Sequence, residues 1–136
     1  MSPRRRRLSL YFRLYPDQNV RQAHVREFLR SLARRHRGHL ILLWDGGSPH
    51  QGKRLKAFLR EHPRLHIERF PAYAPELNPD EGVWHLAKTA LANGRPDLLE
   101  ELTRRVRATL REIARSPHHL RGCIRQTPLP LFLPGI

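Results

Sequence analysis

The sequence predicts an α/β fold in which helices flank a sheet that contains parallel strands. Two runs have the length of strands: residues 40–44, which are all apolar, and residues 65–70, which mix apolar with polar and charged side chains. Segments whose apolar residues recur with the period of a helix lie before, between and after these runs. Such an alternation of strands and helices is typical of layered α/β proteins. The chain has 136 residues, enough for one domain with a substantial core.

The first half of the chain gives two strands and a helix. Residues 8–14 alternate apolar and polar side chains, which predicts a strand with one buried face. From Val20 to about His36, apolar residues recur as a helical stripe, and Gly38 ends it. Residues 40–44 are apolar on both faces, which predicts a central, parallel strand.

The middle of the chain predicts a short helix, a strand and a loop. The helix is stopped by His62-Pro63, because the residue before a proline avoids the helical conformation. Its inward-facing residues are expected to be Leu55, Phe58 and Leu59. Residues 65–70 form the next strand, and residues 71–75, bounded by prolines, form a rigid loop. The following helix runs from Pro79 to about Ala92, with Asn78 as its N-cap and Asn93-Gly94 at its end.

A last helix is expected from Asp97 to about Arg115. Its buried stripe consists of Leu98, Leu102, Val106, Leu110 and Ile113. Its other face carries Arg104, Arg105, Arg107 and Arg111. Glu100 and Glu101 lie four residues before the first two arginines, which predicts ordinary ion pairs along the helix. The chain therefore divides into a basic tail (1–7), a domain (8–120) and a proline-rich tail (121–136).

The charge of the chain favours a nucleic-acid partner. Lys and Arg number 26 against 12 Asp and Glu, which gives a net charge of +14, and all but three of the cations are arginines. Arginine makes bidentate contacts with phosphate. The alternative is that a GC-rich genome encodes arginine wherever a solvated surface needs a cation. No export signal and no membrane span is recognised in the sequence. The single cysteine, Cys123, excludes an internal disulfide and fits a reducing cytoplasm, and we expect it to be a small buried hydrophobic residue.

Two carboxylates occupy positions that suit metal chemistry. Asp45 directly follows the apolar run 40–44, and Glu81, 36 residues later, is the third residue of a predicted helix. Ligands of open parallel sheets gather at the carboxyl ends of the strands. Carboxylate oxygens are the donors that Mg²⁺ prefers. Structural alternatives remain open, because Glu81 could complete a capping box with Asn78 and Asp45 could simply form a turn.

The motifs around these two acids resemble one family. Residues 41–45, with His50 downstream, and the segment 71–84, which reads Pro-x-Tyr-x-Pro-x-Leu-Asn-Pro-x-Glu-x-x-Trp, are similar to the DDE superfamily endonuclease domain of mariner-like bacterial insertion-sequence transposases. The resemblance implies a ribonuclease-H-like mixed sheet with flanking helices. It also implies cleavage and transfer of DNA strands that depends on Mg²⁺ or Mn²⁺. By position, Asp45 and Glu81 would be the second and third catalytic acids and metal ligands.

The sequence departs from the family pattern in three places. Gly46 stands where the family often has Asn, and Asp80 stands where it usually has an aliphatic residue. The first catalytic Asp of the family has no counterpart, because Asp17 lies on the wrong element. The chain thus resembles the C-terminal part of a transposase that lacks the first strand or strands. We expect it to be inactive when isolated.

The resemblance also implies partners and a location. DNA, as transposon ends and target, is the expected partner, and an upstream transposase fragment or a second copy of the chain are further candidates. Candidate DNA contacts are His50, Lys53, Arg54, Tyr73, His85 and Lys88. Trp84 is expected in the core. The implied location is the bacterial cytoplasm, in association with the nucleoid, without a membrane.

Two other functions are alternatives to a transposase. The first is a non-catalytic, nucleic-acid-binding fragment that modulates full-length transposase. The second is a nucleotide hydrolase, because residues 47–53 match the spacing of a phosphate-binding loop. Arg54 replaces the hydroxyl residue that such a loop needs, and Pro49 removes one of its amides, so the sequence argues against it.

Overall fold

The computed structural model describes residues 8–44, 52–94 and 96–128. The chain forms two compact units. Residues 18–74 form one, which we call the strand unit, and residues 1–17 with 75–136 form the other, the helical unit. Each has its own hydrophobic cluster.

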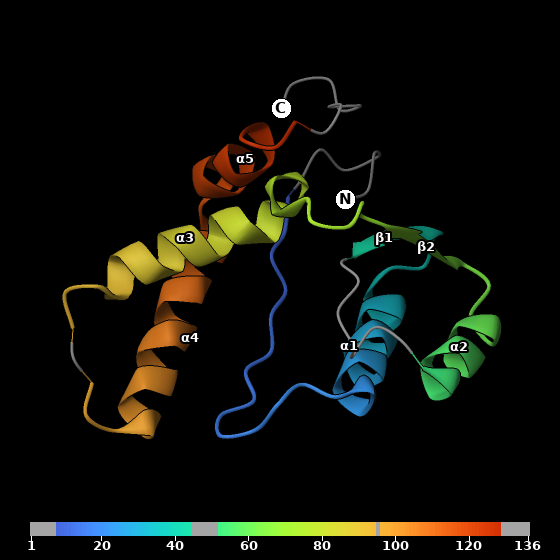
Figure 1. Ribbon diagram of the computed structural model, residues 1–136, viewed down its shortest axis with the longest axis horizontal. Coiled ribbons are helices and arrows are strands. Elements are labelled where there is room, and N and C mark those ends of the chain that lie inside the picture. Colours follow the sequence, from blue (N-terminus) through green and yellow to red (C-terminus); the bar gives the residue numbers. More distant parts are fainter. Residues whose placement is uncertain (1–7, 45–51, 95, 129–136) are drawn as a thin grey trace. The chain divides into compact units, whose positions relative to one another are not determined.

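The strand unit contains α1 (Gln22–Arg35), β1 (Leu40–Trp44), α2 (Lys53–Arg60) and β2 (Leu65–Arg69). The two strands pair in parallel, with Leu40 opposite Leu65 and Trp44 opposite Arg69. Figure 1 shows α1 and α2 on the same side of this small sheet. The parallel pairing predicted for residues 40–44 is therefore confirmed.

One face of the sheet is packed and the other is open. Leu40, Leu42 and Trp44 of β1 pack on a cluster of buried residues from α1, α2 and β2: Val25, Leu29, Ala33, Leu55, Phe58 and Leu65. The alternate residue Ile41 is 72% exposed. The expectation that residues 40–44 are buried on both faces is therefore wrong for the described part of the chain. The reason is that both helices cover the same face, so alternate side chains of β1 have no cover.

Arg64 joins α1 to the start of β2. Its guanidinium donates hydrogen bonds to the carbonyls of Ala33 and His36, at the end of α1. These carbonyls have no partner within the helix, and the negative end of the helix dipole favours a cation there. Arg64 therefore fixes how α1 enters the turn that leads to β1.

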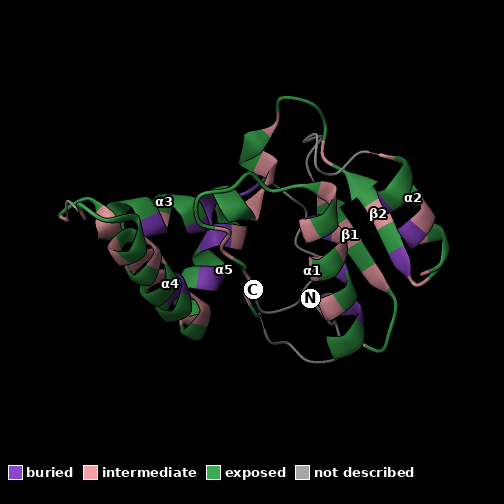
Figure 2. Ribbon diagram, turned by 90° about the horizontal axis from the view of Figure 1, so that it is seen from below, coloured by how far each residue is buried: buried purple, intermediate pink, exposed green. Residues whose placement is uncertain are grey.

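The helical unit contains α3 (Pro79–Leu91), α4 (Leu99–Arg115) and α5 (Pro117–Arg125), preceded by a short 3-10 helix, η3 (Pro75–Leu77). All three helices contribute buried residues, which are purple in Figure 2. The cluster consists of Val83, Ala87, Leu110, Ile113, Leu120 and Cys123. Helix α5 was not predicted, and it continues past residue 120, after which the tail was expected to start.

Residues 8–14 are extended, but they form no strand. Leu8, Leu10, Phe12 and Leu14 pack against the helical cluster, while Ser9, Tyr11 and Arg13 are exposed. The predicted alternation of buried and exposed residues is therefore confirmed, and the predicted strand is wrong. Apolar side chains at every second residue indicate only that one face of the segment is covered. A strand also needs a neighbouring backbone to complete its hydrogen bonds. Here the covering surface is made of helices.

The apolar stripe of α4 is only half covered. Val106, Leu110 and Ile113 belong to the cluster, whereas Leu98 and Leu102 are exposed, contrary to prediction. The N-terminal part of α4 extends beyond α3, as Figure 1 shows. Among the described helices, none is both long and apolar enough to cross a membrane.

The burial difference along α4 gives a matched pair of substitutions. Leu110 is 2% exposed and Leu99 is 50% exposed on the same helix. We expect Leu110→Ala to lower the free energy of unfolding by about 2–5 kcal/mol, because it removes buried methyl groups and leaves a cavity. Leu99→Ala should change it by about 1 kcal/mol or less. Urea denaturation monitored by circular dichroism measures both, and equal effects would contradict the described packing of α4.

Candidate functional site

The N-terminal end of α3 is the best-defined part of the predicted site. Asn78 caps the helix, because its side-chain oxygen accepts a hydrogen bond from the Asp80 amide at 3.1 Å. Pro79 occupies the first helical position, where its missing N–H costs nothing. The Asn78 amide in turn donates to the carbonyl of Pro75 at 2.9 Å, which links η3 to α3. The helix boundaries predicted from Asn78 and Pro79 are confirmed.

The carboxylate of Glu81 is exposed in the first turn of α3. It makes no hydrogen bond or ion pair with any residue that the structure describes. In a capping box, Glu81 would accept from the Asn78 amide, but that amide already donates to Pro75. Glu81 is therefore not used to cap α3, and its oxygens remain available to a cation.

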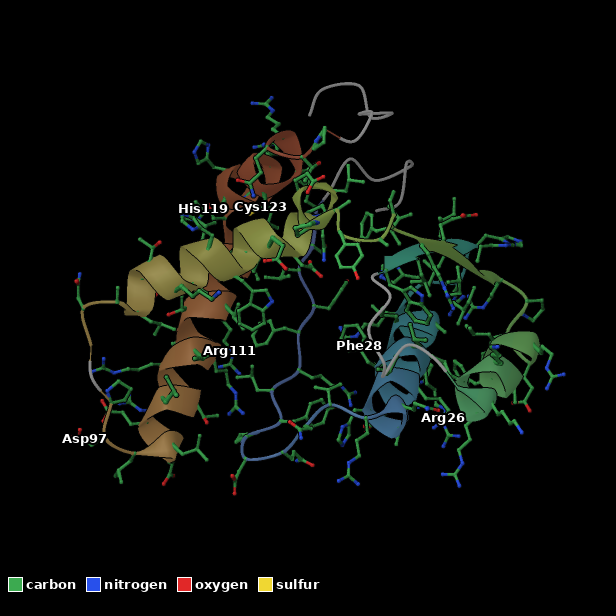
Figure 3. The ribbon with its side chains drawn as sticks, in the orientation of Figure 1. Arg26, Phe28, Asp97, Arg111, His119 and Cys123 are labelled. Atoms are coloured by element: carbon green, nitrogen blue, oxygen red, sulfur yellow. The ribbon has the colours of Figure 1, made fainter. Side chains whose placement is uncertain are left out.

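Close contact with α5 holds this end of α3 in place. Gly82 is buried, and a Cβ atom at this position would lie 3.1 Å from the Cβ of Cys123 and would collide with the side-chain amide of Gln126. Only glycine allows this approach without a shift of α5. Cys123, labelled on α5 in Figure 3, is buried as predicted. Burial raises the pKa of the Cys123 thiol, and the nearby negative charge of Asp80 raises it further, so the thiol stays protonated at neutral pH.

The open face of α3 carries the polar groups of the site. Glu81, His85 and Lys88 lie at helical spacing on this face, and all three are exposed. Trp84 lies beside them and is 45% exposed, so the expectation that it belongs to the core is wrong. The physical reason is that Val83 and Ala87 already face the cluster, which turns position 84 toward the open side.

Asp45 and His50 lie outside the described residues. The peptide immediately before Asp45 is nevertheless well placed, because the Trp44 carbonyl accepts a hydrogen bond from the Phe70 amide at 3.0 Å. The pairing of β1 with the segment after β2 thus continues to the last residue of β1. The carboxyl end of the parallel strand β1 therefore lies at Trp44, the last residue described before this gap.

The remaining predicted contacts are all exposed. Lys53 and Arg54 begin α2. Tyr73 is fully exposed and has a φ of 57°, an uncommon backbone conformation for a residue with a side chain. The described residues contain no group of three metal-ligating side chains. One face of α3 therefore carries an exposed carboxylate together with an aromatic ring, an imidazole and an ammonium.

A comparison with protein families identifies the chain. The family described as DDE superfamily endonuclease matches residues 5–103, a range that includes Asp45 and the whole of α3. The chain belongs to this family. No relative among curated proteins matches the DDE endonuclease chain.

A solved structure shows the fold. The DDE endonuclease chain is similar to the catalytic domain of Mos1 mariner transposase, with a TM-score of 0.58 and 21% sequence identity. The similarity covers 86% of this chain and 68% of that one. The fold is thus the ribonuclease-H-like α/β fold, as the sequence motifs implied. The described part of its sheet has two strands, β1 and β2.

Removal of the cap tests how the end of α3 is held. We expect Asn78→Ala to lower the free energy of unfolding by about 1 kcal/mol, because the Asp80 amide loses its acceptor. Asn78→Asp should preserve stability, since a carboxylate also caps a helix and favours its positive end. Thermal denaturation at pH 7 measures both, with the exposed Asn93→Ala as the control. An unchanged midpoint for Asn78→Ala would show that the hydrogen bond does not hold the helix end.

Proposed function

We propose that this chain supplies part of the catalytic centre of a DDE transposase, with Asp45 and Glu81 as two of its metal-binding acids. The observation that carries the proposal is the Glu81 carboxylate, which is exposed at the start of α3 and is not used as a cap. Family membership and the ribonuclease-H-like fold support it, because an endonuclease must act on a phosphodiester backbone. The reaction we propose is cleavage and transfer of DNA strands.

The donor chemistry fits a divalent cation of the Mg²⁺ class. Glu81 offers oxygen atoms with no competing partner among the described residues, and Asp45 directly follows the carboxyl end of β1. Such an ion, when bound, neutralises phosphate charge and lowers the pKa of an attacking water. The two acids would hold it from separate elements. Asp80, beside Glu81, instead lies next to Cys123 and contributes to the raised pKa of that thiol.

The other groups on the open face of α3 would hold the nucleic acid. His85 and Lys88 can donate to phosphate oxygens, which fixes the position of a strand without reading its sequence. Trp84 offers a partly exposed ring on which an unpaired base can stack. The net charge of +14 would draw the DNA to this surface. Lys53, Arg54, Tyr73 and His50 remain proposed DNA contacts.

Divalent-metal binding should require both acids. We expect Mn²⁺ to bind the chain, and we expect Asp45→Asn and Glu81→Gln each to weaken that binding by about tenfold or more, because each removes a charged ligand. Isothermal titration calorimetry measures the affinity. Asp97→Asn, which alters an exposed acid at the edge of α4, is the matched control. Binding that survives both site substitutions, or that is lost equally in the control, would argue against the assignment.

The 136-residue chain alone should not cleave DNA. The family site uses three acids, and only two of them have counterparts in this sequence. The second ion of a two-metal site would then be held too weakly to stabilise the leaving oxygen. We expect no conversion of supercoiled plasmid to open circle in the presence of Mn²⁺. Nicking that disappears in Asp45→Asn would instead show that the two acids suffice or that Asp80 or Asp17 acts as a third.

A further inference from the structure

One face of α4 carries four arginines in a continuous row. Arg104, Arg107, Arg111 and Arg115, which we call the arginine stripe, are spaced by three, four and four residues, and all are exposed. At 3.6 residues per turn they lie within an arc of about 80°, and at 1.5 Å per residue they extend over about 16 Å. Arg111 is labelled on this helix in Figure 3.

The stripe is not neutralised by the protein. None of its four side chains makes a hydrogen bond or ion pair with another described residue. The neighbouring Arg105 differs, because its Nε lies 3.0 Å from the Oε1 of Glu101. The nearest acids of α4 are Glu100, one turn before Arg104, and Glu112, at the edge of the stripe. The ion pairs predicted for Arg104 and Arg105 are thus found only for Arg105.

The stripe works against the stability of the isolated helix. Like charges three or four residues apart on a helix repel each other. The helix is held instead by its opposite face, where Leu110 and Ile113 are buried in the cluster of the helical unit. A row of cations with no partner among the described residues is best explained by a ligand that carries a matching row of negative charge.

We propose that the arginine stripe binds the phosphate backbone of duplex DNA. This inference rests on the proposed function, which makes DNA the partner of the chain. One strand of B-DNA places a phosphate about every 3.4 Å along its axis, so about 16 Å of helix lies alongside about five phosphates. Ala108, exposed beside the stripe between the levels of Arg107 and Arg111, has a short side chain that lets a backbone approach. Arginine adds two parallel hydrogen bonds to each phosphate contact.

An anionic membrane surface fits the helix less well. A helix that lies on a bilayer inserts its apolar face among the lipids. In α4, Leu110 and Ile113 are buried in the protein core, and the exposed Leu99 and Leu102 lie about 120° and 180° around the helix from the centre of the stripe. The stripe can therefore meet a polyanion without any rearrangement of the helical unit, whereas lipid insertion would have to open it.

The test compares two triple variants with the same loss of charge. Arg104→Gln/Arg107→Gln/Arg111→Gln alters the stripe, and Arg34→Gln/Arg37→Gln/Arg60→Gln alters three exposed arginines of the strand unit. Binding to a labelled 30-base-pair duplex is measured by fluorescence anisotropy over a range of salt concentrations. Each phosphate contact contributes about 0.9 to the slope of log K against log salt. We expect the stripe variant to lose about 2 to 3 from this slope and the control variant to lose less than about 1.

Further measurements distinguish a failure of the stripe proposal from a failure of the proposed function. Replacement of the same three stripe arginines by lysine should keep most of the salt slope, since the charge remains. Circular dichroism and the melting midpoint identify a variant that does not fold. Wild-type chain that binds duplex while both glutamine variants bind alike would overturn the stripe but leave the proposed function intact. If the wild-type chain binds no duplex, or binds anionic vesicles through the stripe instead, both the stripe proposal and the DNA partner are overturned. The Mn²⁺ affinity tests the two acids separately.

Discussion

The packing of α3 against α4 and α5 determines which residues of α3 are exposed. Val83 and Ala87 are buried against those helices, and Gly82 allows α5 to approach closely. Only the opposite face of α3 remains open, and it carries Glu81, Trp84, His85 and Lys88. The cap at Asn78 and the proline at position 79 fix where this face begins. Glu81 is consequently placed in the first turn of α3, at the end of the helix that carries a partial positive charge.

Electrostatics divides the surface into two kinds of region. The chain has only 12 acids against 26 lysines and arginines. Because cations are in excess, an exposed carboxylate that forms no ion pair needs an explanation. At Glu81 the explanation we propose is a divalent cation, because its cap role is filled by Asn78. At the arginine stripe the explanation we propose is a phosphate backbone, because no described residue supplies an anion to the four side chains. A metal-binding acid and a row of phosphate-binding arginines would serve the same substrate in different ways, one for reaction and one for position.

The sequence predicted best where the determining interactions are local. Asn78, Pro79 and Asn93-Gly94 define the ends of α3 without reference to the rest of the fold, and the structure places the helix there. The strand predicted at residues 8–14 failed because an alternating pattern shows that one face is covered, not whether a strand or a helix covers it.

Prediction also failed where burial depends on how far a neighbouring helix extends. Leu98 and Leu102 continue the apolar pattern of α4, but the cluster formed with α3 and α5 includes only the later part of the stripe. Helix α5 was missed because it has only nine residues, although Ser116-Pro117 is a recognisable start and Leu120 and Cys123 have helical spacing. Of the two acids, the setting of Glu81 could be predicted from its helix. The setting of Asp45 lies outside the described residues.

We propose that Asp45 and Glu81 bind the same ion. Paramagnetic broadening by Mn²⁺, followed in two-dimensional amide NMR spectra of the labelled chain, tests it most directly, because broadening is confined to groups near the ion. We expect substoichiometric Mn²⁺ to broaden the signals of residues around both 45 and 81. We also expect Asp45→Asn to remove the broadening at Glu81. Broadening at Glu81 that persists unchanged in Asp45→Asn would contradict a shared site.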